Sequence, residues 1–214
     1  MSKPRVCVKI CGVKQAADVI AAARAGADAV GLNFFPPSPR YIGSLAKAAR
    51  LLKAAAWPRK LLWAGVFVNP QIAEVLSAVE TLALDIVQLH GEESPDWVAA
   101  LKKQLSGKAI WKAVRVSKKR DLAVLAEYHC DAWLIDAKAA KKRGGTGKTF
   151  DWAILKDMQR PVPLVLSGGL NPHNVAAAIR AVKPDWVDVA SGVESSPGVK
   201  DAKLIDAFVR AARG

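Results

Sequence analysis

Cys11 is a candidate for proton-transfer chemistry because it ends a short apolar run, VCVKIC. In a strand, alternate residues share a face, so Cys7, Lys9 and Cys11 are expected to point the same way, into a barrel interior. A thiol at a strand end acts as a base or nucleophile when nearby cations or dipoles lower its pKa. The alternative is a small buried hydrophobe, which is the reading we favour for Cys7 and Cys130.

Asp136 directly follows a second apolar run, AWLI. Burial raises the pKa of a carboxyl, which then stays protonated and serves as a general acid. The alternative is a cap or an ion pair with a lysine such as Lys138. We favour the acid because Cys11 also ends a strand and the two groups are expected at one mouth. His90, in QLHGE, is predicted to orient substrate or to be a structural histidine.

Glycine-containing turns follow the last two apolar runs, SGG and SG. Exposed backbone N–H groups at such turns bind phosphate, and glycine lets the oxygens approach closely. Turns use glycine in any case, but two in register after neighbouring strands favour a phosphate site made by Gly168, Gly169, Ser191 and Gly192. Asp188, at the end of the last strand, is predicted to contact substrate.

The proline-rich stretch FFPPSPRY, residues 34–41, holds Arg40 on a stiff loop. A planar guanidinium suits a carboxylate, so Arg40 is a candidate for binding a substrate carboxylate at the mouth. The alternative is a surface arginine on a rigid turn.

The stretch KRGGTGKT, residues 142–149, looks like a nucleotide-binding loop. A phosphate loop needs glycine at position 142, where this chain has Lys142, and it must directly follow a strand. We therefore predict no nucleotide binding. The interpretation is a flexible lid over the mouth, hinged by Gly144, Gly145 and Gly147, with basic side chains that attract phosphate or are simply solvated.

Short β-branched runs alternate with alanine-rich amphipathic stretches along the whole chain. The predicted strands are 6–10, 29–34, 60–68, 86–89, 109–114, 132–135, 164–166 and 186–189. The predicted helices are 14–25, 44–55, 71–79, 95–105, 118–127, 152–158, 174–182 and 201–212. This alternation predicts an α/β fold, a single (β/α)8 TIM barrel over residues 1–214, with a doubly wound open sheet as the alternative. Chemistry in such a barrel lies at the carboxyl ends of the strands, where all the candidates fall.

An aspartate opens every second predicted strand: Asp28, Asp85, Asp131 and Asp185. The spacing is about fifty residues, or two strand–helix units. We expect each carboxylate at the bottom of the barrel, unless the pattern reflects only the frequency of Asp in turns.

The composition limits the class of protein. The 214 residues are 51% hydrophobic, with a formal net charge of +13 and three cysteines. The charge favours acidic partners such as phosphorylated metabolites, nucleic acid or anionic surfaces, but no motif that reads nucleic acid is present. The cysteines lack metal-ligand spacing, and neither a membrane span nor a secretory signal is apparent. We expect a cytoplasmic protein.

Seven strings together resemble the phosphoribosylanthranilate isomerase family, small (β/α)8 enzymes of tryptophan biosynthesis. They run in order along nearly the whole chain: KICG, GADAVGLNFFPPSPRYI, GVFVN, QLHGEE, GGTGKTFDW, LSGGLNP and VDVASGVE.

The resemblance implies an Amadori rearrangement of N-(5-phosphoribosyl)anthranilate to 1-(2-carboxyphenylamino)-1-deoxyribulose 5-phosphate. By residue match, Asp136 protonates the furanose ring oxygen and Cys11 removes the C2′ proton. Arg40 matches the contact to the anthranilate carboxylate, and the glycine turns match the phosphate site. No metal or organic cofactor is implied, and the family contains monomers and homodimers.

One departure is Ala190, where the family often has serine, so one phosphate or ribose contact passes to water or backbone. Two alternatives remain open. A related sugar-phosphate isomerase of both histidine and tryptophan synthesis uses an aspartate where this chain has Cys11. A basic nucleic-acid binder is the non-enzymatic alternative, for which we expect only weak, non-specific binding.

Overall fold

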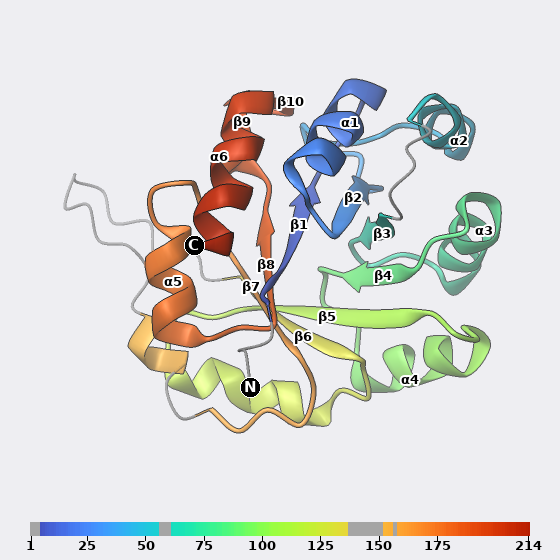
Figure 1. Cartoon of the computed structure of the whole chain (residues 1–214). Helices are drawn as coiled ribbons and strands as arrows, with labels where there is room; N and C mark the ends of the chain where they lie inside the picture. The colour runs from blue at the N-terminus through green and yellow to red at the C-terminus, as the bar shows by residue number, and fades with distance from the viewer. Residues whose placement is uncertain (1–4, 56–60, 137–151, 156–157) are drawn as a thin grey trace.

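The computed structural model describes residues 5–55, 61–136, 152–155 and 158–214. Eight parallel strands close into a barrel in chain order (Figure 1). The strands are β1 (Cys7–Cys11), β2 (Ala29–Asn33), β3 (Leu62–Phe67), β4 (Ile86–Leu89), β5 (Ala109–Arg115), β6 (Ala132–Asp136), β7 (Leu164–Ser167) and β8 (Trp186–Val189). The barrel closes where β1 pairs with β8, with Lys9 opposite Asp188. The predicted (β/α)8 barrel is confirmed and the open sheet is excluded.

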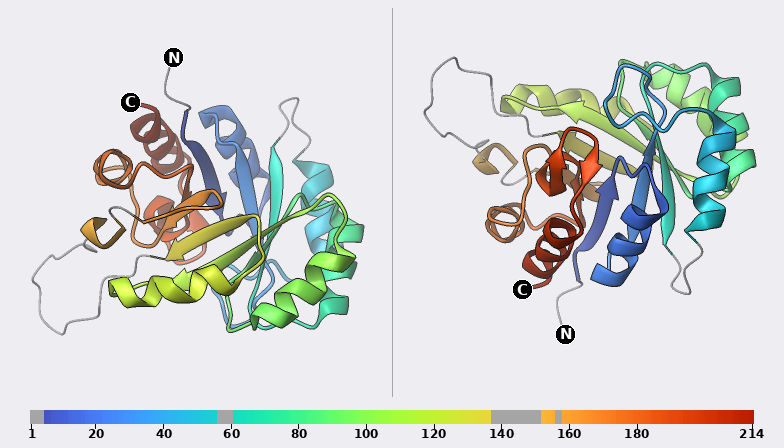
Figure 2. Two further views of the ribbon diagram at one scale, coloured as in Figure 1. Left: turned by 90° about the horizontal axis from the view of Figure 1, so that it is seen from below. Right: turned by 90° about the horizontal axis from the view of Figure 1, so that it is seen from above.

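The helices lie outside the strands, as both views of Figure 2 show. They are α1 (Ala16–Ala25), α2 (Leu45–Ala54), α3 (Ile72–Leu82), α4 (Pro95–Gln104), η1 (Lys119–Glu127), η2 (Trp152–Leu155), α5 (Val175–Val182) and α6 (Ala202–Arg213). Local sequence sets their ends. Ser94 caps α4 by accepting a hydrogen bond from the Trp97 N–H, and Gly26 ends α1 with a positive φ of 91°.

Apolar side chains fill two separate spaces. The larger core lies between barrel and helices, and a smaller cluster fills the lower barrel interior. Within the interior, Trp111 packs edge-to-face on Trp186 with ring centroids 5.1 Å apart. The barrel is therefore a packed core at this level, and polar groups occupy only its upper end.

The bottom of the barrel repeats one arrangement four times. The Asp28 carboxylate accepts a hydrogen bond from the Val8 N–H, 2.8 Å away, while the Asp28 N–H donates to the Val8 carbonyl. Three equivalent pairs follow: Asp85 with Trp63, Asp131 with Ile110, and Asp185 with Leu164. Each aspartate thus joins the start of an even-numbered strand to the preceding odd-numbered strand. The predicted repeat and its location are confirmed.

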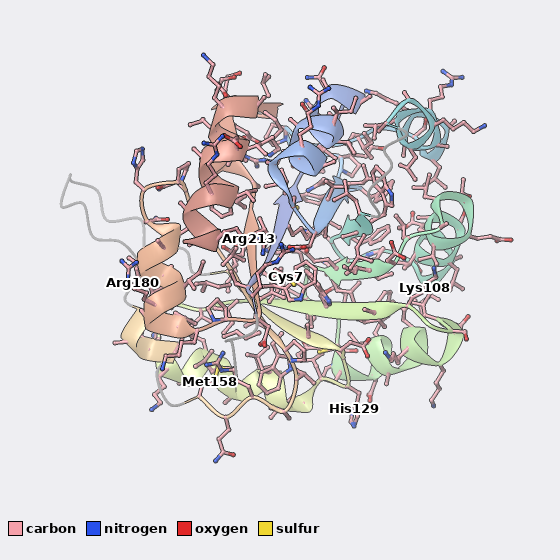
Figure 3. All side chains as sticks on the ribbon, in the orientation of Figure 1. Cys7, Lys108, His129, Met158, Arg180 and Arg213 are labelled. Carbon is pink, nitrogen blue, oxygen red and sulfur yellow. The ribbon has the colours of Figure 1, made fainter. Side chains whose placement is uncertain are left out.

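Arg213, at the end of α6, completes this lower face. Its guanidinium donates to the carbonyls of Val6 and Gly26 and pairs with Asp28 at 2.6 Å. Figure 3 shows Arg213 close to Cys7 at the start of β1, whereas Lys108, His129 and Arg180 lie at the periphery. The last helix is therefore tied to the first strand.

Two predicted α-helices are wrong in type. The segment predicted as 118–127 is a 3-10 helix over Lys119–Glu127, and the one predicted as 152–158 is a 3-10 turn over Trp152–Leu155, with residues 156–157 outside the description. Only Leu125 is buried in the first and only Leu155 in the second. Helices gain most of their stability from a packed apolar face, and here that face is small, with only partly buried Leu122 added in the first segment and Trp152 and Ile154 in the second.

A short antiparallel hairpin follows β8 and was not predicted. After the 3-10 turn η3 (Ser191–Val193), β9 (Glu194–Ser196) pairs with β10 (Val199–Lys200). The turn is Pro197–Gly198, with Gly198 at a φ of 80°. Proline followed by glycine is typical of a type II turn, so a signal was present in the sequence.

Candidate active site

The carboxyl ends of the strands surround a cavity of about 220 Å³ at the barrel mouth. The cavity collects residues that are far apart in sequence. It is lined by Cys11, Asn33, Arg40, Val66, Gln88, His90, Asp136, Ser167, Gly168, Gly169, Leu170, Asp188, Val189, Ala190 and Ser191. Every predicted site residue except Gly192 lines it, and Gly192 follows directly in the chain.

Cys11 lies at the top of β1 above a buried ion pair. Lys9 Nζ is 2.8 Å from Asp188 Oδ1, and both side chains are almost fully buried. Burial alone lowers the pKa of Lys9, but Asp188 and Cys11 outweigh it, so the pKa is raised and Lys9 is an ammonium. Gly31 on β2 makes room, because a Cβ there would lie 3.0 Å from Cys11 Sγ and 3.1 Å from Lys9 Nζ.

The thiol of Cys11 is protonated in this resting site. Burial raises its pKa above the ordinary 9.0, with a further contribution from Asp188, whereas Lys9 and Lys200 act in the opposite direction. The cations that could lower the pKa are therefore present, but their effect is smaller than that of burial.

Asp136 faces His90 across the mouth. His90 Nε2 lies 3.4 Å from Asp136 Oδ2, and both side chains are mostly buried. On its other side, His90 Nδ1 lies 3.3 Å from Gln88 Nε2. The two ring nitrogens of His90 are therefore held between the Gln88 amide and the Asp136 carboxyl group. Gln88, which is 1% exposed, thus sets the orientation of a histidine that contacts the candidate acid.

The two glycine turns meet at the mouth after β7 and β8, next to the end of β6 that carries Asp136. Gly168 and Gly169 have φ values of 88° and 67°, and a Cβ on Gly169 would meet no atom within 4 Å. Gly192 is tight instead, because a Cβ there would clash with the Leu170 carbonyl. The turn at Gly169 therefore leaves its backbone open to a ligand, whereas the turn at Gly192 packs directly against the first turn.

Arg40 is held at the mouth by a carboxylate from the hairpin. Its Nε and Nη2 lie 2.7 Å and 2.6 Å from the two oxygens of Glu194. Lys200 Nζ is 2.7 Å from Glu194 Oε1 and also donates to the Ala190 carbonyl at 2.9 Å. Arg40 is thus held in place by a two-point contact, with its side chain 21% exposed.

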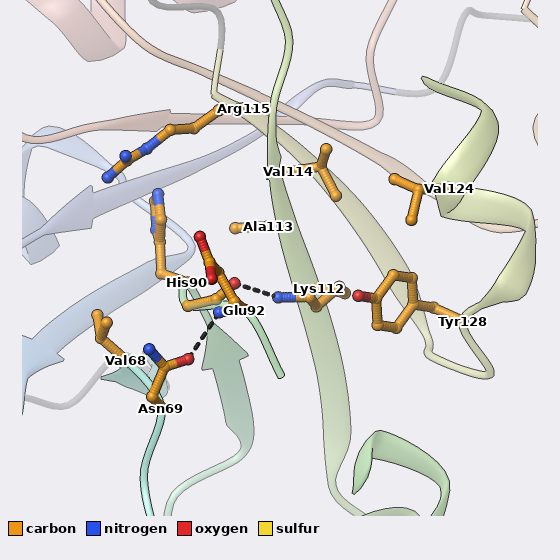
Figure 4. Close-up of a pocket in the computed structure, with 11 residues that line it drawn as sticks. Val68, Asn69, His90, Glu92, Lys112, Ala113, Val114, Arg115, Val124 and Tyr128 are labelled. Atoms are coloured by element: carbon orange, nitrogen blue, oxygen red, sulfur yellow. Dashed lines mark hydrogen bonds between the residues drawn. The ribbon is translucent and has the colours of Figure 1, made fainter. Parts of the chain in front are cut away.

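A second cavity of about 560 Å³ adjoins the mouth, and His90 stands between the two (Figure 4). Lys112 lies beneath it, with Nζ 2.6 Å from Glu93 Oε2, 2.7 Å from the Gly91 carbonyl and 5.4 Å from the ring centre of Tyr128. These contacts fix the loop after β4, and hence the position of His90.

Sequence reasoning missed Glu194 and Lys200, and it gave no role to two further residues that shape this site, Lys9 and the strand-end residue Gln88. Lys9 carried a usable signal, since alternation already placed it on the face of Cys11. Glu194 and Lys200 flank the Pro–Gly turn, but nothing local indicates that they reach Arg40. The lid interpretation of residues 142–149 lies outside the described residues. Among those that the structure describes, no group of three or more His, Cys, Asp or Glu is arranged to hold a metal.

Fold and site together define a (β/α)8-barrel enzyme with titratable groups, an arginine and glycine turns at the carboxyl end of its strands. Within the described ranges, no helix has the length and apolarity to cross a membrane.

Comparison with known proteins narrows this class. A sequence model of the N-(5'-phosphoribosyl)anthranilate isomerase family matches residues 8–211. The enzyme of that name from Rhodopseudomonas palustris (strain BisB5) is 46% identical over 213 residues, covering 97% of this chain and 96% of the relative. The crystal structure of phosphoribosyl anthranilate isomerase from Thermotoga maritima has a TM-score of 0.85 at 41% identity, covering 98% and 99% of the two chains.

Another similar structure is a phosphoribosyl anthranilate isomerase in complex with reduced 1-(o-carboxyphenylamino)-1-deoxyribulose 5-phosphate. It has a TM-score of 0.82 at 39% identity and covers 98% of this chain. The chain therefore belongs to the N-(5'-phosphoribosyl)anthranilate isomerase family of tryptophan biosynthesis, and it is an isomerase.

Proposed function

We propose that this chain catalyses the Amadori rearrangement of N-(5-phosphoribosyl)anthranilate to 1-(2-carboxyphenylamino)-1-deoxyribulose 5-phosphate, as one catalytic domain over residues 1–214. The observation that carries the proposal is the mouth cavity, where Cys11 and Asp136 share one space with Arg40 and the glycine turns. An acid, a base, a carboxylate partner and a phosphate cradle are what this substrate requires.

Asp136 is the proposed general acid. It donates a proton to the furanose ring oxygen, the C1′–O bond breaks, and the nitrogen lone pair forms a C1′=N iminium. His90 is the positioning partner, because its Nε2 contacts the same carboxyl group. The ring oxygen becomes a hydroxyl, so the step needs only the proton that Asp136 supplies.

Cys11 is the proposed general base, and the iminium makes that role possible. A cation beside a buried thiol lowers its pKa, adding to the effect of Lys9 and opposing the burial that raises it. The same cation acidifies the C2′–H bond. The Cys11 thiol gives its proton to solvent, and the resulting thiolate takes the C2′ proton. The C–H electrons form an enolamine, which tautomerises to the ketone, and solvent returns one proton to Asp136.

Binding is proposed to come from the two ends of the substrate. Arg40 contacts the anthranilate carboxylate, and the backbone of Gly168, Gly169, Ser191 and Gly192 holds the phosphate. Asp188 neutralises Lys9 beneath the substrate, where the two side chains form a buried ion pair. Asp188 is also proposed to contact the substrate directly.

The direct test is to generate N-(5-phosphoribosyl)anthranilate in situ and follow the loss of its fluorescence. Purified protein is expected to accelerate the loss, and the double variant Cys11→Ala/Asp136→Asn, purified identically, is the matched control. Equal rates with and without wild-type protein would end the proposal. Turnover of the corresponding histidine precursor would instead favour the bifunctional isomerase, whose base is an aspartate.

We further propose that the enzyme acts in the cytoplasm without a cofactor, as a monomer or homodimer, and binds nucleic acid only weakly and non-specifically. Affinity for DNA that persists as salt is raised would contradict the last point, because charge-driven binding is salt-sensitive.

A further inference from the structure

The hairpin after β8 contributes a carboxylate to the mouth from outside the barrel. Glu194, at the start of β9, has a side chain that is 3% exposed, and it binds Arg40 through both guanidinium nitrogens of one edge. The two residues are 154 positions apart, on loops after β2 and β8. Such two-point contact fixes both the position and the plane of a guanidinium.

We propose that Glu194 is a positioning residue, which presets Arg40 to receive the carboxylate of the substrate. This inference rests on the proposed function. The Arg40 atoms Nε and Nη2 face Glu194, and within the described part of the chain Nη1 has no hydrogen-bond partner. Arg40 lines the mouth cavity, so the Nη1 side of the guanidinium is the part left for a ligand.

The charges of the cluster support positioning rather than neutralisation. Lys200 is also buried, with a side chain 1% exposed, and it binds the same carboxylate as Arg40. Burial lowers the pKa of Lys200 despite the hydrogen bond that Lys200 donates to Glu194. Burial alone raises the pKa of Glu194, but the hydrogen bonds from Arg40 and Lys200 lower it overall, so Glu194 is a carboxylate. Two cations against one anion leave a positive charge at the mouth.

The surroundings of Arg40 fit the same role. A Cβ on Gly12 would lie 2.6 Å from Arg40 Cδ, so the arginine stem passes directly over the residue after Cys11. The hairpin turn at Gly198 packs on the Pro39 carbonyl, which also accepts a hydrogen bond from Lys14 Nζ at 3.0 Å. The arginine therefore loses its side-chain freedom on folding, and less is lost when the substrate binds.

The test compares two substrates that differ only in the carboxylate. One is the phosphoribosyl derivative of anthranilate and the other is that of aniline, with products followed by chromatography. For Glu194→Gln we expect kcat/KM to fall on the order of 100-fold with the anthranilate substrate. With the aniline substrate we expect a fall of about threefold or less, because this substrate has no carboxylate for Arg40 to bind. If the aniline derivative turns over too slowly, its inhibition constant replaces kcat/KM.

Three further variants keep the test decisive. Glu194→Asp keeps the charge balance but withdraws the carboxylate by one methylene, and it should also lose the preference for the carboxylate. Arg40→Met combined with Glu194→Gln should be no worse than Arg40→Met alone, because both act through one contact. Lys200→Met leaves the Arg40–Glu194 contact in place but removes the hydrogen bond to the Ala190 carbonyl. It should therefore lower kcat/KM for both substrates by the same factor.

Equal losses on both substrates in Glu194→Gln would overturn the inference and indicate a merely structural carboxylate. A lower KM for the anthranilate substrate in that variant would also overturn it, because Glu194 would then compete with substrate for Arg40. Absence of activity in the wild-type protein would instead refute the proposed function, so the two failures are distinguishable.

Discussion

The two ends of the barrel are built on opposite plans. At the bottom, Asp28, Asp85, Asp131 and Asp185 make the same pair of hydrogen bonds four times, each to the neighbouring strand. At the top, each strand ends in different groups, from the thiol of Cys11 to the carboxyl of Asp136. A structural requirement common to all strands is met by repetition, whereas a reaction needs each group once.

The ends also differ in how they treat charge. The Asp131 side chain at the bottom is 38% exposed, and its ion pair with Lys102 is open to solvent. At the top, Lys9 is fully buried against Asp188, and Lys200 against Glu194. Desolvation makes a buried ion pair an inefficient source of stability, so these pairs indicate positioning of the mouth.

The largest expected effects are on catalysis at the top. Cys11→Ala and Asp136→Asn should each lower kcat by about 100- to 10,000-fold with little change in KM, because each removes a proton transfer in a transition state. Steady-state kinetics measure the effect, and thermal unfolding provides the control. A near-normal kcat in either variant would mean that the wrong group has been assigned.

Removing a repeated carboxylate at the bottom should have the reverse signature. Asp85→Ala leaves the Trp63 N–H without its acceptor, so the free energy of unfolding should fall by about 1–3 kcal/mol while kcat stays unchanged. Denaturant titration measures the fall. The exposed pair Asp206–Arg210 supplies the control, since Asp206→Ala should cost about 0.5 kcal/mol or less. A lower kcat in Asp85→Ala protein that is still folded would contradict the prediction that the lower end of the barrel serves stability alone.

The two charged residues beneath Cys11, Lys9 and Asp188, should shift the pKa of its thiol in opposite directions. Lys9→Met removes a cation that lowers the pKa of Cys11, so alkylation of Cys11 at pH 9 should slow, by about tenfold for each unit of pKa. Asp188→Asn removes an anion that raises the pKa and should speed alkylation. Mass spectrometry of the Cys11 peptide measures both, with the Cys7 peptide as internal reference. Shifts in the same direction for both variants would contradict this electrostatic account.

The smallest expected effect is on alkaline stability. Burial raises the pKa of Cys11 above that of the unfolded chain, so the folded state holds its proton more tightly. The resulting stability is complete below the ordinary value of 9.0 and is lost as pH rises through the raised pKa, at up to about 1.4 kcal/mol per pH unit. Unfolding at a series of pH values should show a shallower loss in Cys11→Ala. An unchanged slope would place the titration on Cys7 or Cys130, whose pKa values burial also raises.

The sequence predicted what repeats and what lies at strand ends. Strand–helix alternation gave the barrel, and the spacing of Asp28, Asp85, Asp131 and Asp185 gave its lower face, because both are local patterns with fixed periods. The rule for strand ends brought Cys11, Asp136 and the glycine turns to one cavity. The roles of these residues in the reaction stay predictions.

What the sequence did not predict depends on tertiary contacts. The pairing of Arg40 with Glu194 joins two loops that meet only after the barrel closes. Segment 119–127 has helix-forming residues, yet its 3-10 form follows from how little of it is buried, which is decided by its neighbours. Whether cations lower the pKa of Cys11 was left open by the sequence, because the opposing effect of burial is a property of the whole fold.

The hydrogen bonds of Arg213 place the end of the last helix beside Val6 and Asp28. The hydrogen bonds between each of the four aspartates and the neighbouring strand stay within one pair of strands. The backbone could therefore be cut at a turn between two strand pairs without breaking any of these bonds. The exposed turn at Gly107, between the second and third strand pairs, is such a place, since a Cβ there would meet no atom within 4 Å. In this sense the lower end of the barrel is a closed ring of four equivalent strand pairs, each held by the same aspartate bonds.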